Sequence, residues 1–207
     1  RVILHVSIGV FYCRMPGDSE GAIVSLTRKV IPTVTGDGTS TVEELVKSSD
    51  AVNKKAIREA MGPRLGEVPS EGATIQTLVG ASHSRGCIFL DASALVTESL
   101  TRRMNEICTI EGFHFGRLDV RAASLSDFQN GEFRIIEING ATSEMIHVYD
   151  SRISLLEGLA ILKHQWSLLF EIAHRCAGRA ERIPFFKFLG LYRSFYLSTR
   201  HAVGKLW

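Results

Sequence analysis

The sequence predicts an α+β fold, and three observations carry this prediction. Two β-rich runs, residues 1–14 and 21–35, are separated by the turn-forming stretch MPGDSE at 15–20. Two further strand-like runs lie within residues 115–144. Residues 151–176 are apolar on much of a helical circumference and end before Gly178, which is typical of one long helix. Strands concentrated in local hairpins, with helices flanking them, predict an antiparallel sheet with flanking helices.

The remaining elements follow from caps, breakers and periodicity. Residues 39–48 predict a short helix, because Ser and Thr stand at the start and Glu lies in the first turn. Residues 53–62 predict a second short helix, and the Pro- and Gly-rich residues 63–75 predict a loop. The stretch 77–91 predicts a strand, a polar loop and a strand. Residues 94–110 predict an amphipathic helix, since apolar side chains recur there at helical spacing.

Composition excludes several classes of protein. The chain has 207 residues, of which 45% are hydrophobic and 22% charged, and its formal net charge is +2. These values are ordinary for a globular protein and give no general argument for a nucleic-acid or membrane partner. The four cysteines are far apart and form no CxxC pair, so neither a disulfide framework nor a thiolate zinc site is expected. A reducing cytoplasm is the predicted location.

The most informative stretch is FGRLDVRAASLSDFQNGEFRIIEINGATSE at 115–144. Its two strand-like runs carry Arg117, Asp119, Glu137 and Asn139 where a buried strand would carry apolar side chains. Buried charges cost several kcal/mol unless they are paired. Side chains alternate faces along a strand, so Arg117 and Asp119 share one face, and Glu137 and Asn139 share a face of the second strand.

If the strands pair with Asp119 opposite Glu137, two carboxylates and an amide oxygen meet on one spot. These are the hard oxygen ligands that Mg²⁺ prefers. Arg117 beside them would be a fixed cation for developing phosphoryl or oxyanion charge. The pattern therefore predicts a magnesium site, with Asp119, Glu137 and Asn139 as ligands.

Two alternatives stay open from spacing alone. A two-residue turn on Asn130 and Gly131 would put Asp119 opposite Thr142, so the metal site needs a wider loop across residues 124–131. The charged residues could also form salt bridges on a solvated sheet face, Asp119 with Arg121 and Arg117 with Glu137.

Several segments resemble the carboxyl-terminal portion of the ATP-grasp fold. GRLDVR at 116–121, IIEING at 135–140 and ATSEMIHVYD at 141–150 are similar to the metal-binding strands of carboxylate–amine ligases such as D-alanine–D-alanine ligase and the cyanophycin synthetase ligase module. RKVIPTVTGDGTSTVEELV at 28–46 resembles their strand, Gly-Asp-Gly turn and helix. GASHSRGCIF at 80–89 resembles their glycine-containing loop near the nucleotide phosphates. The resemblance covers roughly residues 8–172.

The resemblance implies an ATP-dependent ligase that phosphorylates a carboxylate and passes the acyl group to an amine. Asp119, Glu137 and Asn139 would hold Mg²⁺ (or Mn²⁺), and Arg117 would be the catalytic cation. Contacts with ATP phosphates or substrate are expected for four further residues, His83, Arg85, Arg121 and Ser143. A solvated loop is the alternative for His83 and Arg85, and pairing with Asp119 is the alternative for Arg121. The partners would be ATP and small-molecule carboxylate and amine substrates, with no nucleic acid. The sequence does not indicate an oligomeric state or the identity of the substrates.

The resemblance implies that residues 1–174 form a partial ATP-grasp domain whose amino-terminal part is expected to be missing, and the composition sets apart a tail at 175–207. The tail has seven Lys or Arg residues against one acid, with aromatic residues interleaved. It predicts a terminal helix that docks on the domain, with an anionic membrane surface or a partner as the alternative. A non-catalytic descendant that binds nucleotide or a partner, and a membrane-surface or scaffold module, are the alternative functions.

Overall fold

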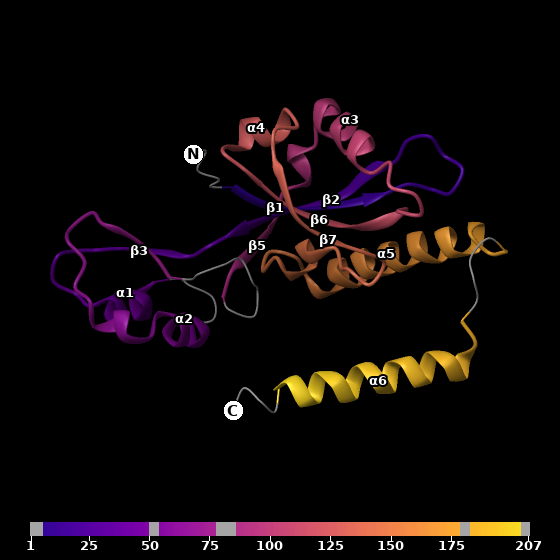
Figure 1. The fold of residues 1–207 in the computed structure, drawn as a ribbon. Helices are drawn as coiled ribbons and strands as arrows, with labels where there is room; N and C mark the ends of the chain where they lie inside the picture. The colour runs from indigo at the N-terminus through magenta and orange to yellow at the C-terminus, as the bar shows by residue number, and fades with distance from the viewer. Residues whose placement is uncertain (1–5, 50–53, 78–85, 179–182, 204–207) are drawn as a thin grey trace. The chain divides into compact units, whose positions relative to one another are not determined.

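A five-stranded antiparallel sheet forms the centre of the computed structural model, which describes residues 6–49, 54–77, 86–178 and 183–203. The strand order is β5-β2-β1-β6-β7 (Figure 1). The strands are β1 (Val6–Cys13), β2 (Ala22–Val30), β5 (Ile88–Asp91), β6 (Phe115–Ala122) and β7 (Arg134–Asn139). The predicted antiparallel sheet with flanking helices is therefore confirmed.

One face of this sheet is apolar and carries the main core. Alternation along β1 puts Ile8, Val10 and Tyr12 on this face, and all three are at most 1% exposed. They pack against Leu100 and Met104 of α3 (Glu98–Ile107), in the same cluster as Phe128 of α4 (Leu125–Gln129). Figure 1 shows α3 and α4 above this face. The predicted amphipathic helix at 94–110 is confirmed but begins later, because Thr97 caps it by accepting from the Leu100 N–H.

The opposite face of the sheet, called the polar face below, carries buried polar side chains. It carries Ser25 and Thr27 of β2, both buried, together with Lys29 and Asp119. The short 3₁₀ helix η4 (Ile146–Tyr149) covers part of this face, since the Ser25 hydroxyl and His147 Nδ1 lie 2.6 Å apart. The long helix α5 (Leu155–Arg175) lies on the same side (Figure 1). The buried rings of Phe11 and Phe115 lie on this face as well, with centroids 4.8 Å apart, so it combines polar and apolar groups, whereas the main apolar cluster lies on the other face.

A smaller group of elements follows β2. Pro32 interrupts the predicted strand at 21–35, and the chain continues as β3 (Thr33–Thr35), which pairs with β4 (Thr74–Gln76). Helices α1 (Val42–Ser48) and α2 (Lys54–Met61) and the 3₁₀ helix η1 (Gly62–Gly66) pack Val42, Val46 and Ile57 into a second cluster. Thr41 and Glu44 form a capping box at the start of α1, as the predicted cap requires.

The 3₁₀ helix η3 (Ser93–Leu95) precedes α3.

The hairpin at 115–144 has the wider loop. Asp119 pairs with Glu137 and Arg117 with Asn139 across β6 and β7. Helix α4 fills the loop, capped by Ser124, which accepts from the Asp127 N–H. Asn130 and Gly131 end this helix instead of forming a two-residue turn: the Gly131 N–H donates to Phe128 O and the Glu132 N–H to Asp127 O, and Gly131 has φ 84°.

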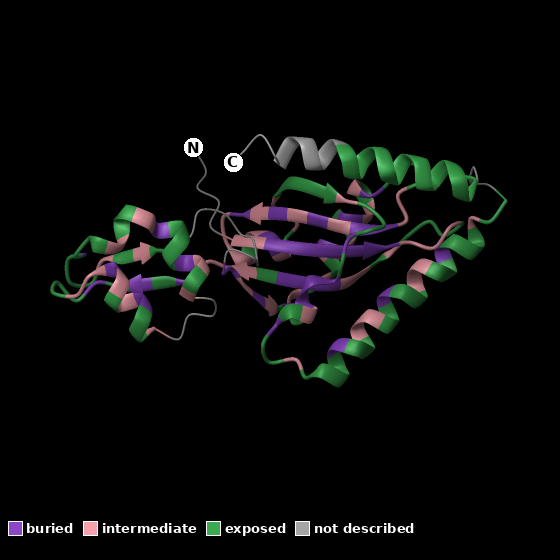
Figure 2. Cartoon of the chain, turned by 90° about the horizontal axis from the view of Figure 1, so that it is seen from below, coloured by how far each residue is buried: buried purple, intermediate pink, exposed green. Residues whose placement is uncertain are grey.

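The expectation that both strands of this hairpin are buried was wrong. Strand β7 is an edge strand whose apolar side chains are largely exposed, including Ile136 at 60% and Ile138 at 44%. Glu137 is exposed as well. Its carboxylate therefore has no burial cost to offset, whereas Arg117 and Asp119 on the inner strand β6 are only 16% and 14% exposed. Figure 2 shows the buried central strands and the exposed helix faces.

The chain forms two compact units, Arg1–Ile172 and Ala173–Trp207, so the structural boundary lies two residues before the predicted one at 174. The second unit contains the last turn of α5 and helix α6 (Phe185–Val203). The predicted helix at 151–176 starts at Leu155, because Ser154 and Glu157 form the cap at its first turn. Across the described residues, no helix combines the length and apolarity that a membrane span requires.

Candidate functional site

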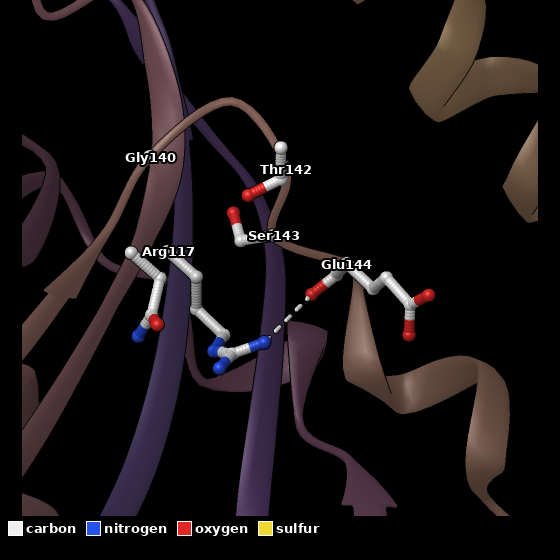
Figure 3. A pocket seen from close by; sticks show the side chains of 6 residues that line it. Arg117, Gly140, Thr142, Ser143 and Glu144 are labelled. Carbon is white, nitrogen blue, oxygen red and sulfur yellow. Dashed lines mark hydrogen bonds between the residues drawn. The ribbon is translucent and has the colours of Figure 1, made fainter. Parts of the chain in front are cut away.

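A cavity of about 240 Å³ lies where β7 ends and the chain turns toward η4. Its walls are formed by Arg117, Asn139, Gly140, Thr142, Ser143 and Glu144 (Figure 3). Strand β6 supplies Arg117, β7 supplies Asn139, and the other four residues follow β7 directly. Three of the predicted site residues, Arg117, Asn139 and Ser143, therefore line one cavity.

Two polar atoms of this cavity lack a hydrogen-bond partner within the described structure. They are Asn139 Nδ2 and Ser143 Oγ, and both are buried. An unsatisfied buried polar group costs about 1–3 kcal/mol, and in a cavity wall it indicates a place where a ligand or water oxygen would bind. Arg117 lines the same cavity, and its guanidinium donates from Nη1 to the Glu144 carbonyl at 3.2 Å (Figure 3). The cavity thus presents donors and a cation, which suits an anionic oxygen group.

Asp119 is held between two cations. Its Oδ1 lies 2.8 Å from Lys29 Nζ and 3.1 Å from Arg117 Nε. The Lys29 side chain is 8% exposed, so this ion pair is largely removed from water. Among the described residues these are the ion pairs of Asp119, and the alternative pairs, Asp119 with Arg121 and Arg117 with Glu137, were wrong.

Gly9 of β1 makes room for this arrangement. It pairs with Asp119 on the adjacent strand, and a Cβ there would lie 3.2 Å from Arg117 Cδ and 3.4 Å from Asp119 Oδ1. Contacts that close are tighter than ordinary van der Waals packing, so even an alanine would push against Arg117. The absence of a side chain at Gly9 therefore leaves room for the ion pair of Arg117 and Asp119 on this face.

The predicted metal ligands form a set of suitable chemistry. Directly opposed residues in an antiparallel pair share a face, so the register places the Asp119 and Glu137 side chains on one face, with Asn139 two pairs further along, opposite Arg117. Glu137 is exposed and open to an ion, while Asp119 Oδ1 is already occupied by Lys29 and Arg117. In the part of the chain that the structure describes, no three His, Cys, Asp or Glu residues cluster as metal ligands. Carboxylate and carboxamide oxygens are ligands that Mg²⁺ accepts. Because Asp119 is already paired with two cations, the assignment of these three residues to a metal ion stays a prediction.

A buried glutamine of α5 holds the cavity wall. Gln165 is 4% exposed; its Oε1 accepts from the Met145 N–H at 2.6 Å, and its Nε2 donates to the Ser143 carbonyl at 3.4 Å. The side chain therefore fixes the backbone on both sides of Glu144. Sequence reasoning missed Gln165. Its signal was an uncharged polar residue inside a largely apolar helix, which is ambiguous without knowing what faces it. Lys29 was missed for a similar reason, because a lysine in a strand is usually exposed.

The other predicted contacts lie elsewhere. Arg121 pairs in register with Ser7 and Arg134, beyond Asp119 and outside the residues that line the cavity. His83 and Arg85 lie outside the described residues. The predicted roles of these three residues stay predictions.

Two titratable groups secure the cover of the polar face. Burial lowers the pKa of His147 below its ordinary value and outweighs the opposing effect of Asp91 and Asp150. The Asp150 carboxylate accepts from the Asp91 N–H at 2.8 Å and from Arg152, and the hydrogen bonds to Arg152 hold the pKa of Asp150 well below its usual range. These bonds fix η4 to β2 and β5 next to the cavity.

Comparisons with known proteins give little beyond this geometry. No known family matches the sequence, and no curated protein matches it. Among solved structures, the chain is similar to a bifunctional glutathione synthetase from Pasteurella multocida, with 15% sequence identity and a TM-score of 0.45. The similarity covers 80% of this chain and 24% of that chain, so this chain spans less than a third of that protein.

Proposed function

We propose that the chain is the carboxyl-terminal portion of an ATP-grasp ligase, which uses ATP and Mg²⁺ to join a carboxylate to an amine through an acyl phosphate. One observation carries the proposal: the cavity that holds Arg117 and the two unsatisfied polar atoms lies next to the opposed carboxylates Asp119 and Glu137. Oxygen donors for a cation and nitrogen donors for an anion thus occupy adjacent positions on one sheet face, as phosphoryl transfer requires.

The chain's residues divide this chemistry between them. Arg117 is fixed through Nε by Asp119 and through Nη1 by the Glu144 carbonyl, which leaves Nη2 for an anionic group. Such a cation neutralises the charge that develops on an acyl phosphate and on the tetrahedral oxyanion after amine attack. Asn139 Nδ2 and Ser143 Oγ have no hydrogen-bond partner within the described structure, so a substrate oxygen bound in the cavity wall would satisfy either of them. Positioning and charge neutralisation supply most of the catalysis in this class of reaction.

Asp119, Glu137 and Asn139 are the residues that would hold Mg²⁺ or Mn²⁺. The ion, when bound, supplies charge neutralisation between the phosphate oxygens of ATP. The Asn139 carboxamide can serve both partners, because its oxygen is a metal ligand and its buried nitrogen is a donor. A volume of about 240 Å³ suits the reacting group of a substrate better than a whole nucleotide.

The test is ATP consumption by the chain with a panel of amino acids and other carboxylates, with and without Mg²⁺. Where turnover is undetectable, Mg²⁺-dependent binding of ATP is measured by equilibrium dialysis. Arg117→Ala and Glu137→Ala are each expected to lower the Mg²⁺-dependent signal at least a hundredfold, roughly the effect of removing an oxyanion donor. Glu132→Ala is the control, since Glu132 is an exposed acid of the same hairpin. A Mg²⁺-dependent signal that Glu137→Ala and Arg117→Ala leave unchanged contradicts the proposal.

A further inference from the structure

Helix α6 has an aromatic face, which we define as Phe185, Phe188, Leu189 and Tyr192. These residues recur at helical spacing, and Phe188 and Tyr192 stack with ring centroids 6.4 Å apart. Phe195 and Tyr196 continue the same spacing. The four side chains are 67%, 52%, 43% and 60% exposed. Within the unit Ala173–Trp207, a large apolar surface is therefore open to solvent, far more than scattered single residues would give.

The positive charge of the unit Ala173–Trp207 indicates which kind of partner it fits. The sequence from 175 to 207 has seven Lys or Arg residues and only Glu181 as an acid, and α6 itself contains no Asp or Glu. Lys187 lies with Gly190 and Ser194 on the side of the helix opposite the aromatic face, and Arg193 borders that face. An apolar face with one basic residue at its edge and another on the opposite side of the helix fits a surface whose outer layer is anionic and whose interior is apolar.

We infer that α6 lies in the plane of an anionic membrane surface, with the aromatic face toward the acyl chains and Lys187 and Arg193 toward the headgroups. This inference does not depend on the proposed ligase activity. Aromatic rings sit well at the boundary between headgroups and acyl chains, because they combine an apolar body with a polarisable edge. Each basic residue near the surface strengthens binding about fivefold, and this contribution weakens as salt is added.

The test is co-sedimentation of the full chain with phosphatidylcholine vesicles that do or do not contain phosphatidylserine. The wild-type chain is expected to bind the phosphatidylserine vesicles and to bind phosphatidylcholine alone at least tenfold more weakly. Lys187→Gln with Arg193→Gln is expected to weaken binding about 25-fold. The matched control is Lys55→Gln with Arg64→Gln, the same charge change on exposed residues of the first unit.

The apolar contribution is tested separately. Phe188→Ser with Tyr192→Ser is expected to lower vesicle binding at least tenfold, whereas Val68→Ser with Ile110→Ser, a control on exposed apolar residues of the first unit, is expected to leave it unchanged. Equal binding to both kinds of vesicle, or equal losses in a variant and its control, overturns the inference. So does a lowered melting temperature of Phe188→Ser with Tyr192→Ser without loss of vesicle binding, since it would show that the aromatic face packs on protein.

Discussion

Lys29 Nζ and Asp119 Oδ1 form an ion pair of 2.8 Å on the polar face of the central sheet. The lysine comes from β2 and the aspartate from β6, on either side of β1. Their side chains are 8% and 14% exposed, so water screens the pair little. The ion pair fixes the Asp119 carboxylate, which the proposed function assigns to Mg²⁺. The stability of the fold therefore also depends on this carboxylate.

Removal of this carboxylate should destabilise the fold without unfolding it. Asp119→Asn leaves Lys29 as a nearly buried cation beside Arg117, and we expect it to lower the free energy of unfolding by about 3 kcal/mol. The double variant Lys29→Met with Asp119→Asn should recover more than half of that loss, because the uncompensated cation is gone. Urea unfolding measures both. Asp18→Asn, at an exposed turn, is the control, and an equal effect there would rule out a role for the ion pair.

Removal of Gln165 should loosen the cavity wall. Gln165→Leu leaves the Met145 N–H without its acceptor, which we expect to cost about 1–3 kcal/mol of stability. Hydrogen exchange at the Met145 amide should accelerate more than exchange in β6. His164→Leu is the matched control, since His164 is the exposed neighbour on α5. If exchange at Met145 is unchanged in Gln165→Leu, the glutamine does not hold this segment.

Stability should fall as pH is lowered below about 6.5, and His147 should account for much of this. Its pKa is depressed in the folded state, so the unfolded chain takes up a proton at a higher pH than the folded chain does. The contribution is complete above the ordinary pKa of 6.5, and it is lost as pH falls through that value toward the lower folded pKa. One group changes stability by at most about 1.4 kcal/mol per pH unit. His147→Gln should flatten the pH profile of urea unfolding, whereas His164→Gln should reproduce the wild-type slope.

Three of the four thiols should be unreactive in the folded protein. Burial raises the pKa of Cys13 and Cys87 to about 11 and that of Cys108 to about 12, and all three are at most 5% exposed. Cys176 is partly exposed. A thiol reagent at neutral pH should therefore modify Cys176 alone, and all four after unfolding. Rapid reaction of a second thiol under native conditions would contradict the described core.

The sequence was sufficient for the class of fold and for most elements, because caps and periodicity are local signals. The register of the hairpin was not decidable from it. Asn130 and Gly131 suit both a two-residue turn and the end of a short helix, and the choice depends on Ser124 capping α4 and on Phe128 entering the core. A helix of five residues has too little periodicity to be recognised from sequence.

The candidate site was predictable in its residue types but not in its partners. Alternation along β6 and β7 correctly grouped Arg117 with Asp119 and Glu137 with Asn139. The partners Lys29 and Gln165 lie 90 and 22 residues away in sequence from Asp119 and Ser143, respectively, and only the sheet order and the packing of α5 bring them together. The exposure of β7 was also not predictable, since an apolar edge strand has the same sequence pattern as a buried strand.

Whether Asp119, Glu137 and Asn139 hold a divalent cation is measured most directly by paramagnetic broadening of backbone amide signals by Mn²⁺ in the presence of ATP. Mn²⁺ takes the same oxygen ligands as Mg²⁺ and broadens the signals of nuclei near it. We expect the amide signals of Asp119, Glu137 and Asn139 to broaden first, that of Glu132 to be spared, and excess Mg²⁺ to reverse the effect. Broadening centred elsewhere, or the same broadening in Glu137→Ala, would contradict the proposed metal site.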